Sequence, residues 1–251
     1  MVKNFIFKFL GNESLWIVIP VFNESESIGI VLEELFGYLG ILQLNTRVLV
    51  VNDSSVDDTK KVLDGLLGEF QNLEVIEHHQ QLGKTEAIKS GFSIFLKGSD
   101  RFCITMDGDG QDDPIYIPKI LKELAIYPVV NGSRIKRGDR ALKLLGSYLF
   151  NLAWRSVYRL PKDINSGFKG FHRTAVHSLM PTLSDDSFRL SLPALHRMNF
   201  GIGSIEIIGR ERKYGKSKFQ VRGKVIKAIL TFIRYIFSSN QQLNYTSRQE
   251  I

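Results

Sequence analysis

The sequence has almost none of the thiols from which disulfide frameworks and zinc centres are built. Its 251 residues include one cysteine, Cys103, which lies inside an apolar run. A single thiol excludes an internal disulfide and a cysteine-rich metal cluster, and it fits a reducing compartment. The adjacent His78 and His79 have no cysteine partner and no third ligand at helical spacing, so we interpret them as ordinary loop residues. No uninterrupted apolar run reaches the roughly 18 residues that a membrane-spanning helix needs.

Familiar phosphate and calcium motifs are also missing. No G-x-G-x-x-G follows the first apolar run, which excludes the dinucleotide-binding fingerprint. Gly83-Lys84-Thr85 resembles the end of a P-loop, but His78 stands where that motif needs its first glycine. The acidic stretch that starts at Asp107 begins like an EF-hand, yet it has Asp112 in place of the glycine and Pro118 in place of the glutamate. A structural calcium loop is therefore not expected.

Positive charge is concentrated near the end of the chain. Residues 209–251 contain ten Lys/Arg and two Asp/Glu, a local net charge of +8, whereas the whole chain carries +7. Everything before residue 209 therefore has a net charge of −1. A basic segment on a near-neutral body indicates an anionic partner, which could be nucleic acid, a phosphate group or the anionic face of a membrane.

Short apolar runs alternate with helical patterns through the first half of the chain. Continuous apolar runs are typical of parallel strands buried on both faces. Their alternation with amphipathic segments predicts βαβ units, and hence an α/β fold with a mostly parallel sheet flanked by helices. The expected strands are 15–20, 47–51, 73–77 and 102–106, and the expected helices start at 28, near 57–59, and at 86.

The second half is expected to continue with both element types. Its expected elements are a helix at 115–126, a strand at 129–130 ending in 131–134, an apolar helix at 142–158, a loop at 163–168 followed by a strand and a helix, a strand at 205–208, and an amphipathic helix at 224–237.

Polar side chains follow three of the first four predicted strands. Asn23 and Glu24 follow the first strand, Asp53 the second, and Asp107 and Asp109 the fourth. Ligands of parallel sheets bind outside the carboxyl ends of the strands. We therefore expect these side chains to form one site.

The acidic stretch after the fourth strand is the strongest single signal. Residues 107–113 include four aspartates, which repel one another unless a cation lies among them. Glycines alternate with Asp107 and Asp109, so the backbone can bend and turn both carboxylates toward one point. Such oxygen ligands suit Mg²⁺ or Mn²⁺. The alternative is a solvated acidic turn that caps the following helix.

Five motifs in sequence order together carry a family resemblance. They are residues 18–24 (VIPVFNE), 52–59 (NDSSVDDT), 107–111 (DGDGQ), 163–168 (DINSGF) and 212–218 (RKYGKSK). This order resembles the family 2 glycosyltransferases of the GT-A fold. More closely, it resembles the branch that makes dolichyl- or polyprenyl-phosphate sugars, which includes the dolichyl-phosphate mannosyltransferases.

The resemblance, which runs from about Trp16 to Phe219, implies a nucleotide-sugar donor. It implies that Asp107, Asp109 and Gln111 hold Mg²⁺ or Mn²⁺ against the donor diphosphate. In the second motif an asparagine replaces the family's first aspartate, which leaves Asp53 as the expected nucleotide contact. The residues expected to bind the donor are Pro20, Asn23, Glu24, Asp53, Lys84, Asp107 and Lys218.

The acceptor half of the expected site is cationic. A phosphate monoester has a second pKa near 6, so at neutral pH it is already largely an anionic nucleophile and needs cations to position it more than a base. Lys162 is a further candidate for this cradle, and Asp112, Asp113 or Asp163 could still serve as a base. The expected catalytic residues are Asp109, Arg134, Ser166 and Arg212.

The expected domain organisation is a catalytic domain at 1–219, with a donor half at about 15–114 and an acceptor half at about 115–219. Residues 220–251 would form a basic amphipathic helix and a loose tail, with the helix either packed on the body or lying on a membrane.

The expected function is a metal-dependent inverting glycosyltransferase that moves a sugar to a polyprenyl or dolichyl phosphate. It would act peripherally on the cytoplasmic face of a membrane, with no nucleic-acid partner. One alternative is a family member that glycosylates a saccharide hydroxyl. The other is a non-catalytic anion- or nucleic-acid-binding protein that uses the basic C-terminal segment. The donor nucleotide and sugar, the lipid length, the choice of Mg²⁺ or Mn²⁺ and the oligomeric state stay open.

Overall fold

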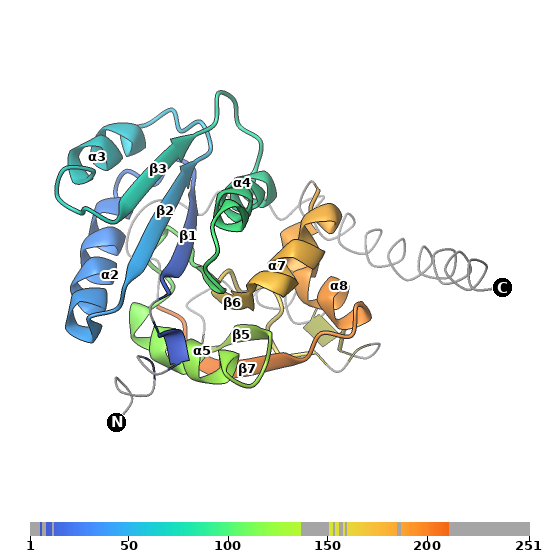
Figure 1. Ribbon diagram of the computed structural model, residues 1–251. Helices are drawn as coiled ribbons and strands as arrows, with labels where there is room; N and C mark the ends of the chain where they lie inside the picture. Colours follow the sequence, from blue (N-terminus) through green and yellow to red (C-terminus); the bar gives the residue numbers. More distant parts are fainter. Residues whose placement is uncertain are drawn as a thin grey trace. The chain divides into compact units, whose positions relative to one another are not determined.

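The computed structural model places most of the chain up to residue 210 (Figure 1). The residues that it describes are 6, 9–11, 13–136, 151–152, 154–155, 158, 160–184 and 187–210. The chain divides into two compact units, one formed by 1–138 with 160–215 and the other by 139–159 with 216–251. In the second unit the rings of Trp154 and Tyr158 stack with their centroids 6.0 Å apart. The predicted helix at 224–237 and most of the one at 142–158 lie outside the described residues.

The first unit contains a seven-stranded sheet with the order β3-β2-β1-β4-β6-β5-β7. Strands β1 to β4 run parallel to one another, β6 is antiparallel to both of its neighbours, and β7 is parallel to β5. The strands are β1 (Leu15–Val21), β2 (Thr46–Asn52), β3 (Leu73–Glu77), β4 (Phe102–Thr105), β5 (Val129–Lys136), β6 (Lys169–His172) and β7 (Ile202–Ile208). This is the mostly parallel α/β sheet that the sequence predicts.

Six helices whose bounds lie among the described residues, and three short 3₁₀ turns, accompany the sheet. The helices are α2 (Ile28–Leu42), α3 (Thr59–Leu66), α4 (Lys84–Lys97), α5 (Ile117–Leu124), α7 (Arg173–Leu179) and α8 (Ser191–Arg197). The 3₁₀ turns are η1 (Pro114–Tyr116), η2 (Met180–Thr182) and η3 (Ser187–Leu190). Within these parts of the chain, no helix has the length and apolar character that crossing a membrane requires.

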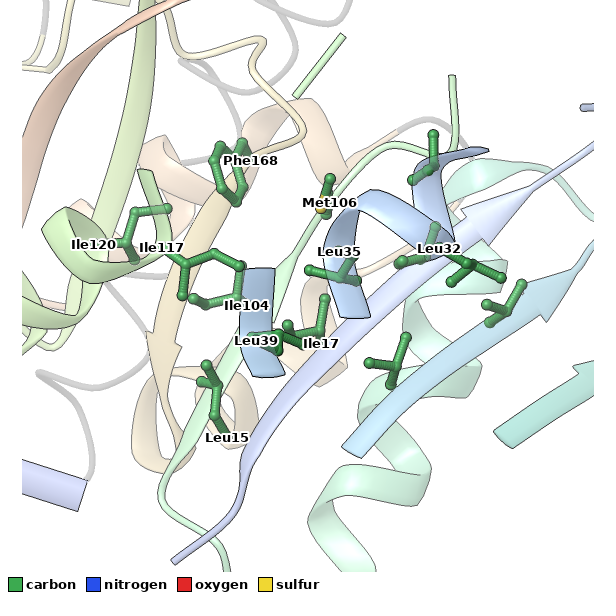
Figure 2. Packing of buried hydrophobic residues seen from close by; sticks show 14 of the residues in the cluster. Leu15, Ile17, Leu32, Leu35, Leu39, Ile104, Met106, Ile117, Ile120 and Phe168 are labelled. Carbon is green, nitrogen blue, oxygen red and sulfur yellow. The ribbon is translucent and has the colours of Figure 1, made fainter. Parts of the chain in front are cut away.

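The sheet is buried on both faces because its central strands are apolar at successive positions. Side chains at alternate positions of β1, such as Leu15 and Ile17, pack with α2 and α5 on one face. Figure 2 shows Leu35 and Leu39 of α2 over this face. The other face packs against α4, where a Cβ on Gly91 would lie 2.4 Å from Val18 Cγ1. This glycine therefore sets how closely α4 approaches β1.

The predicted elements of the first half are confirmed, and their ends move by only a few residues. In the second half the strand expected at 129–130, ending in 131–134, extends beyond those residues. It continues to Lys136, because β7 lies alongside it and supplies pairing partners as far as Lys136. The strand expected at 205–208 likewise begins earlier, at Ile202. Both elements are longer than expected because tertiary pairing, rather than the local apolar run, sets their length.

Candidate active site at the carboxyl ends of the strands

The loops after β1 and β2 hold one another in place. Asn23 has a left-handed backbone (φ 52°), and its N–H donates to Ser55 Oγ at 2.8 Å. Its Oδ1 accepts the Val56 N–H at 2.7 Å. Ser55 Oγ in turn donates to Asn52 Oδ1 at 2.6 Å. Asn23 therefore lies against the end of β2, and the first two predicted motifs form one surface.

Glu24 connects this surface to the acidic loop. Its N–H donates to Thr59 Oγ1 at 2.8 Å. The Ser27 hydroxyl lies 3.1 Å from Glu24 Oε2 and 3.0 Å from the Gly108 carbonyl oxygen, so it bridges the loops after β1 and β4. Pro20, the other donor contact expected from the first motif, lies in β1 within the parallel ladder to β2. Three strand ends are thus joined by short polar side chains.

Asp53, which follows β2, is buried and organises a neighbouring loop. Its Oδ1 accepts the Leu82 N–H at 2.9 Å and lies 2.7 Å from His78 Nδ1. Its Oδ2 accepts the Gly83 N–H at 2.7 Å. These contacts hold the loop at 78–83 beside the end of β2. Contact between Asp53 and a nucleotide stays a prediction.

The acidic loop after β4 is folded back on itself. Asp112 Oδ2 accepts the Asp107 N–H at 2.9 Å, and Asp109 Oδ1 accepts the Gln111 N–H at 3.1 Å. Gln111 Nε2 faces the Arg210 carbonyl oxygen at 3.5 Å, so Oε1 is the oxygen that Gln111 can offer to a cation. The loop therefore folds back onto the Asp107 backbone rather than continuing as an extended chain.

Positive charge balances this loop. The Lys84 ammonium, at the start of α4, forms an ion pair with Asp107. Burial by itself raises the pKa of Asp107, but Lys84, Arg134 and Lys169 outweigh burial and lower it below its ordinary value. For Asp112, burial and the Asp107 charge together raise the pKa to about 7. Neighbouring carboxylates in one loop thus have pKa values shifted in opposite directions, which is common at functional sites.

The Ser166–Gly167 turn lies directly against Asp107. A Cβ on Gly167 would lie 2.6 Å from Asp107 Cγ, so no larger residue fits without moving that carboxylate. Thr105 Oγ1 donates to the Gly167 carbonyl at 2.6 Å, and the Lys169 ammonium donates to the Ser166 carbonyl. The fourth motif therefore adjoins the third, although more than fifty residues separate them in sequence.

Arg134, which lies near the end of β5, extends the cationic side of the site. Its Nε lies 3.1 Å from Asp163 Oδ2, and its Nη2 donates to the Asn165 carbonyl at 3.4 Å. The pair is largely buried, with side-chain exposures of 13% and 4%. Lys162 instead forms an exposed ion pair with Glu206 at 3.5 Å. Arg134 thus holds the loop that carries Ser166, whereas Lys162 lies at the surface.

The acidic loop has the donor set that a hard divalent cation needs. Among the described residues, no group of three or more His, Cys, Asp or Glu side chains could hold a metal ion. Mg²⁺, however, commonly binds through one or two carboxylates together with substrate phosphates, and Asp107 and Asp109 supply two. Asp112 Oδ1 is buried and has no hydrogen-bond partner among the described residues. The residues therefore fit a cation that is shared with a phosphorylated ligand.

The structure brings most of the predicted site residues together and leaves the others undecided. Contacts between neighbouring loops join Asn23, Glu24, Asp53, Lys84, Asp107, Asp109, Gln111, Arg134 and Ser166 around the strand ends. Arg212 and Lys218 lie outside the described residues. The roles assigned to all of these residues stay predictions.

Sequence reasoning missed three residues that shape the site. His78 was interpreted as an ordinary loop residue, but it is the first residue after β3 and it contacts Asp53. The same strand-end rule that selected Asp53 could have selected it. Lys169 is fully buried behind the Ser-Gly-Phe motif, and burial, with Lys84 nearby, lowers its pKa to about 7. Gly167 was quoted only as part of that motif, and its close approach to Asp107 is a tertiary feature with no local signal.

Comparison with curated proteins finds undecaprenyl-phosphate sugar transferases. The "Undecaprenyl-phosphate 4-deoxy-4-formamido-L-arabinose transferase" of Pseudomonas fluorescens (strain SBW25) is 30% identical over 208 residues, which cover 81% of this chain and 59% of that protein. A protein of the same name from Photorhabdus laumondii is 26% identical over 208 residues, 81% of this chain and 62% of that protein. The chain thus spans about three fifths of the length of these relatives.

Solved structures share the fold. Glucosyl-3-phosphoglycerate synthase from Mycobacterium tuberculosis, crystallised with Mn²⁺, UDP and phosphoglyceric acid, matches with a TM-score of 0.70 and 16% identity over 92% of this chain and 82% of that one. Mannosyl-3-phosphoglycerate synthase from Rubrobacter xylanophilus matches with a TM-score of 0.64 and 16% identity over 96% of this chain and 78% of that one. These likenesses confirm the predicted GT-A fold.

The family itself is shown by the sequence. The family described as "Glycosyl transferase family 2" matches residues 16–186, which is more than half of the chain and includes four of the five motifs, from the first strand to the Ser-Gly-Phe turn. The chain belongs to glycosyl transferase family 2.

Proposed function

We propose that this protein transfers a sugar from a nucleotide-sugar donor to a polyprenyl phosphate. Its family supports a glycosyl transfer, and the names of the undecaprenyl-phosphate transferases that it resembles support a lipid phosphate as the acceptor. Residues 1–219 would form the catalytic domain, and the basic segment that follows would lie near the membrane.

One observation carries this proposal. The Ser166–Gly167 turn lies against Asp107, and Arg134 and Lys169 add positive charge next to the same carboxylate. An acidic loop suited to a metal-bound diphosphate is therefore adjacent to cationic side chains, whose charge would favour a second phosphate. A hydroxyl acceptor would instead need a base placed to remove its proton.

The donor side would bind the nucleotide diphosphate. Asp107, Asp109 and Gln111 would hold Mg²⁺ or Mn²⁺, which when bound would neutralise the charge that develops on the leaving nucleoside diphosphate. Lys84 would exchange its ion pair with Asp107 for the donor phosphates, since it lies in the first turn of α4, where the helix dipole also favours an anion. Asn23, Glu24 and Asp53 would face the base and ribose.

The acceptor side would position the lipid phosphate. An oxygen of the phosphate monoester would form the new bond to the anomeric carbon, and the bond from that carbon to the diphosphate would break with its electron pair leaving on the phosphate oxygen. Because the nucleophile is already anionic at neutral pH, the step needs no general base. Arg134, Ser166 and Arg212 would hold the acceptor in line with the donor, which gives inversion at the anomeric carbon.

The acceptor's isoprenoid tail sets where the enzyme works. A long isoprenoid does not leave the bilayer, so the enzyme would approach it peripherally from the cytoplasmic face. The segment 209–251, with its net charge of +8, would be attracted to anionic headgroups.

A donor screen tests this function. Purified protein is incubated with radiolabelled UDP- and GDP-sugars, undecaprenyl or dolichyl phosphate in detergent, and Mg²⁺ or Mn²⁺, and the label is partitioned between water and organic solvent. We expect label in the organic phase with one donor. We expect excess chelator to abolish it, and Asp109→Asn to reduce it by a factor of about 100 or more.

Asp64→Asn is the matched control, because Asp64 is an exposed residue of α3 remote from the acidic loop in sequence. It should transfer sugar at the wild-type rate. Label that appears only in a water-soluble product would favour a hydroxyl acceptor. Turnover that persists in excess chelator would exclude the metal role.

A further inference from the structure

Three side chains from separate elements form one hydrogen-bonded chain beside the proposed donor site. His78 Nδ1 lies 2.7 Å from Asp53 Oδ1, and His78 Nε2 lies 2.9 Å from the Ser90 hydroxyl oxygen. The Asp53 and His78 side chains are only 4% and 10% exposed. The chain connects the ends of β2 and β3 to the middle of α4.

The neighbouring groups fix the direction of the hydrogen bond between His78 and Asp53. The Asp53 carboxylate already accepts two backbone N–H groups, from Leu82 and Gly83, and it can only accept. His78 Nδ1 must therefore carry the hydrogen that points at Asp53. The Ser90 hydroxyl, which can donate or accept, completes the contact at Nε2 and holds the ring in place.

These donors leave Asp53 with little spare acceptor capacity. A carboxylate has about four acceptor positions, two on each oxygen. His78 and Leu82 occupy both positions on Oδ1, and Gly83 occupies one on Oδ2. Among the described contacts, one position on Oδ2 is left for an N–H or O–H of a ligand. His78 and the two backbone N–H groups together thus leave Oδ2 as the oxygen with a spare acceptor position.

The same contacts position a cationic residue. The Gly83 N–H donates to Asp53. Gly83 has a positive φ of 94° and is the residue directly before α4. Lys84 is the next residue, and it pairs with Asp107 of the acidic loop. Asp53 is therefore linked through Gly83 to the N-terminal end of α4, which would face the proposed diphosphate.

A hydrolytic Ser-His-Asp triad is a poor description of this chain. Ser90 lies in the interior of α4, where the neighbouring backbone N–H groups are used by the helix itself. No pair of free N–H groups is placed there to stabilise an oxyanion, which such catalysis requires.

We propose that His78, held by Ser90, is a positioning residue for nucleotide recognition, because it orients Asp53 so that one Oδ2 position faces the base or ribose. This inference rests on the proposed nucleotide-sugar transferase function. His78 touches no reacting atom, and its effect should therefore appear in donor binding rather than in acceptor binding or in the rate at saturation.

Two substitutions at one position test this assignment. The amide of His78→Asn can replace Nδ1 as a donor to Asp53, whereas that of His78→Gln extends toward the position of Nε2 and Ser90. Binding of UDP, GDP, CDP and ADP with Mg²⁺ is measured by calorimetry, and the tightest ligand of the wild type is used throughout. We expect His78→Gln to weaken that ligand by about tenfold to a hundredfold, and His78→Asn to stay within about threefold of the wild type.

The controls are the neighbouring exposed histidine and a serine on the same helix. His79→Gln and Ser93→Ala should bind as the wild type does, while Ser90→Ala should bind about threefold more weakly because the ring loses its partner at Nε2. In turnover the donor KM should rise in His78→Gln, with the acceptor KM and kcat little changed. If His78→Gln does not fold, the nucleotide affinities of Ser90→Ala and Ser93→Ala are compared instead, and equal affinities would overturn the inference.

The outcomes separate this inference from the function on which it rests. Equal nucleotide affinity in His78→Gln and His79→Gln overturns the inference and leaves the transferase function intact. Equal weakening in His78→Asn and His78→Gln, together with lowered thermal stability, assigns His78 a purely structural role and also overturns it. A wild-type protein that binds none of the four nucleotides rejects both the inference and the proposed function.

Discussion

The two sides of the site are held together by different kinds of interaction. Next to β1 and β2 the loops interlock through neutral groups, as in the bonds among Asn23, Ser55 and Asn52. Next to β5 and β6 the loops are held by buried charges, the Arg134–Asp163 pair and the Lys169 ammonium on the Ser166 carbonyl. The contacts around Asn23 are therefore neutral, although the buried Asp53 carboxylate holds the neighbouring 78–83 loop, whereas the loops around Ser166 are held mainly by buried charges.

This difference predicts different responses to pH and to ligands. Neutral hydrogen bonds contribute about 1 kcal/mol each and do not titrate between pH 5 and 9. Buried charges cost more to desolvate than they return unless each finds a partner, so they respond strongly when a partner is removed or an anion arrives. Neutral contacts whose strength does not change with pH suit recognition of one nucleotide, whereas buried charges suit a site that would gain its counter-anion from the proposed acceptor.

The largest loss of activity should come from a substitution at the contact between the two sides, where Gly167 lies against Asp107. In Gly167→Ala the new methyl group would overlap the Asp107 carboxylate and push it away from Lys84 and the acidic loop. We expect kcat/KM for transfer to fall by roughly a hundredfold or more, with a stability loss of about 1–3 kcal/mol from overpacking. Steady-state kinetics and urea unfolding measure the two effects.

Gly65→Ala provides the control for that substitution. Gly65 lies in α3, and a Cβ there meets no atom within 4 Å. The change should leave activity unaltered and should stabilise the helix by up to about 1 kcal/mol. If Gly167→Ala were as active as Gly65→Ala, the close packing of the Ser166–Gly167 turn on Asp107 would have no functional importance.

Removal of one buried charge should have the next largest effect. Asp163→Asn removes the ion-pair partner of the Arg134 guanidinium, whose side chain is only 13% exposed. We expect the free energy of unfolding to fall by about 3 kcal/mol and the acceptor KM to rise, with the donor KM little changed. Chemical denaturation and initial-rate kinetics test this, and an equal rise in both KM values would contradict the division into two sides.

The exposed Lys162–Glu206 pair offers a matched comparison. Its two side chains are 71% and 61% exposed. Glu206→Gln removes one charge from an ion pair, as Asp163→Asn does, but this pair is exposed to solvent. The free energy of unfolding should change by less than about 1 kcal/mol.

Lys169 should make the stability of the charged side depend on pH. Burial, with Lys84 nearby, lowers its pKa to about 7 in the folded state, whereas an unfolded lysine keeps the ordinary value of 10.5. Above pH 7 the unfolded chain therefore binds a proton that the folded chain does not, and stability rises with pH through this group. Relative to Lys169→Met, the wild type should gain about 2 kcal/mol between pH 7 and 8.5. Urea unfolding of both proteins at several pH values measures this difference, and parallel pH profiles would contradict the assignment.

The sequence alone predicted the donor side better than the acceptor side, and the reason is physical. Continuous apolar runs such as 15–20 specify parallel strands locally, and the rule that ligands bind at strand ends then placed Asn23, Asp53 and Asp107 in one region. On the acceptor side, β5 extends to Lys136 only because β7 pairs with it, and no local pattern encodes that pairing.

Individual residues show the same limit. Asp107 and Asp109 were recognisable because the seven residues 107–113 include four aspartates, which need a cation or another positive charge nearby. Lys169 and His78 were not, since a single lysine at the start of a strand or a histidine in a loop acquires meaning only from its tertiary neighbours, Ser166 and Asp53. Pattern reasoning therefore finds clusters of charge and misses residues that act singly.

The smallest effect should come from the neutral scaffold. Ser55→Ala removes the acceptor of the Asn23 N–H and the donor to Asn52 Oδ1, so two buried or half-buried groups lose a partner. We expect the free energy of unfolding to fall by about 1 kcal/mol, equally at pH 6 and pH 9, because none of these groups titrates. Ser99→Ala, an exposed serine between α4 and β4, is the control and should be neutral. Urea unfolding at the two pH values tests the comparison directly, since a pH-dependent loss in Ser55→Ala would mean that the contacts among Asn23, Ser55 and Asn52 also depend on charge.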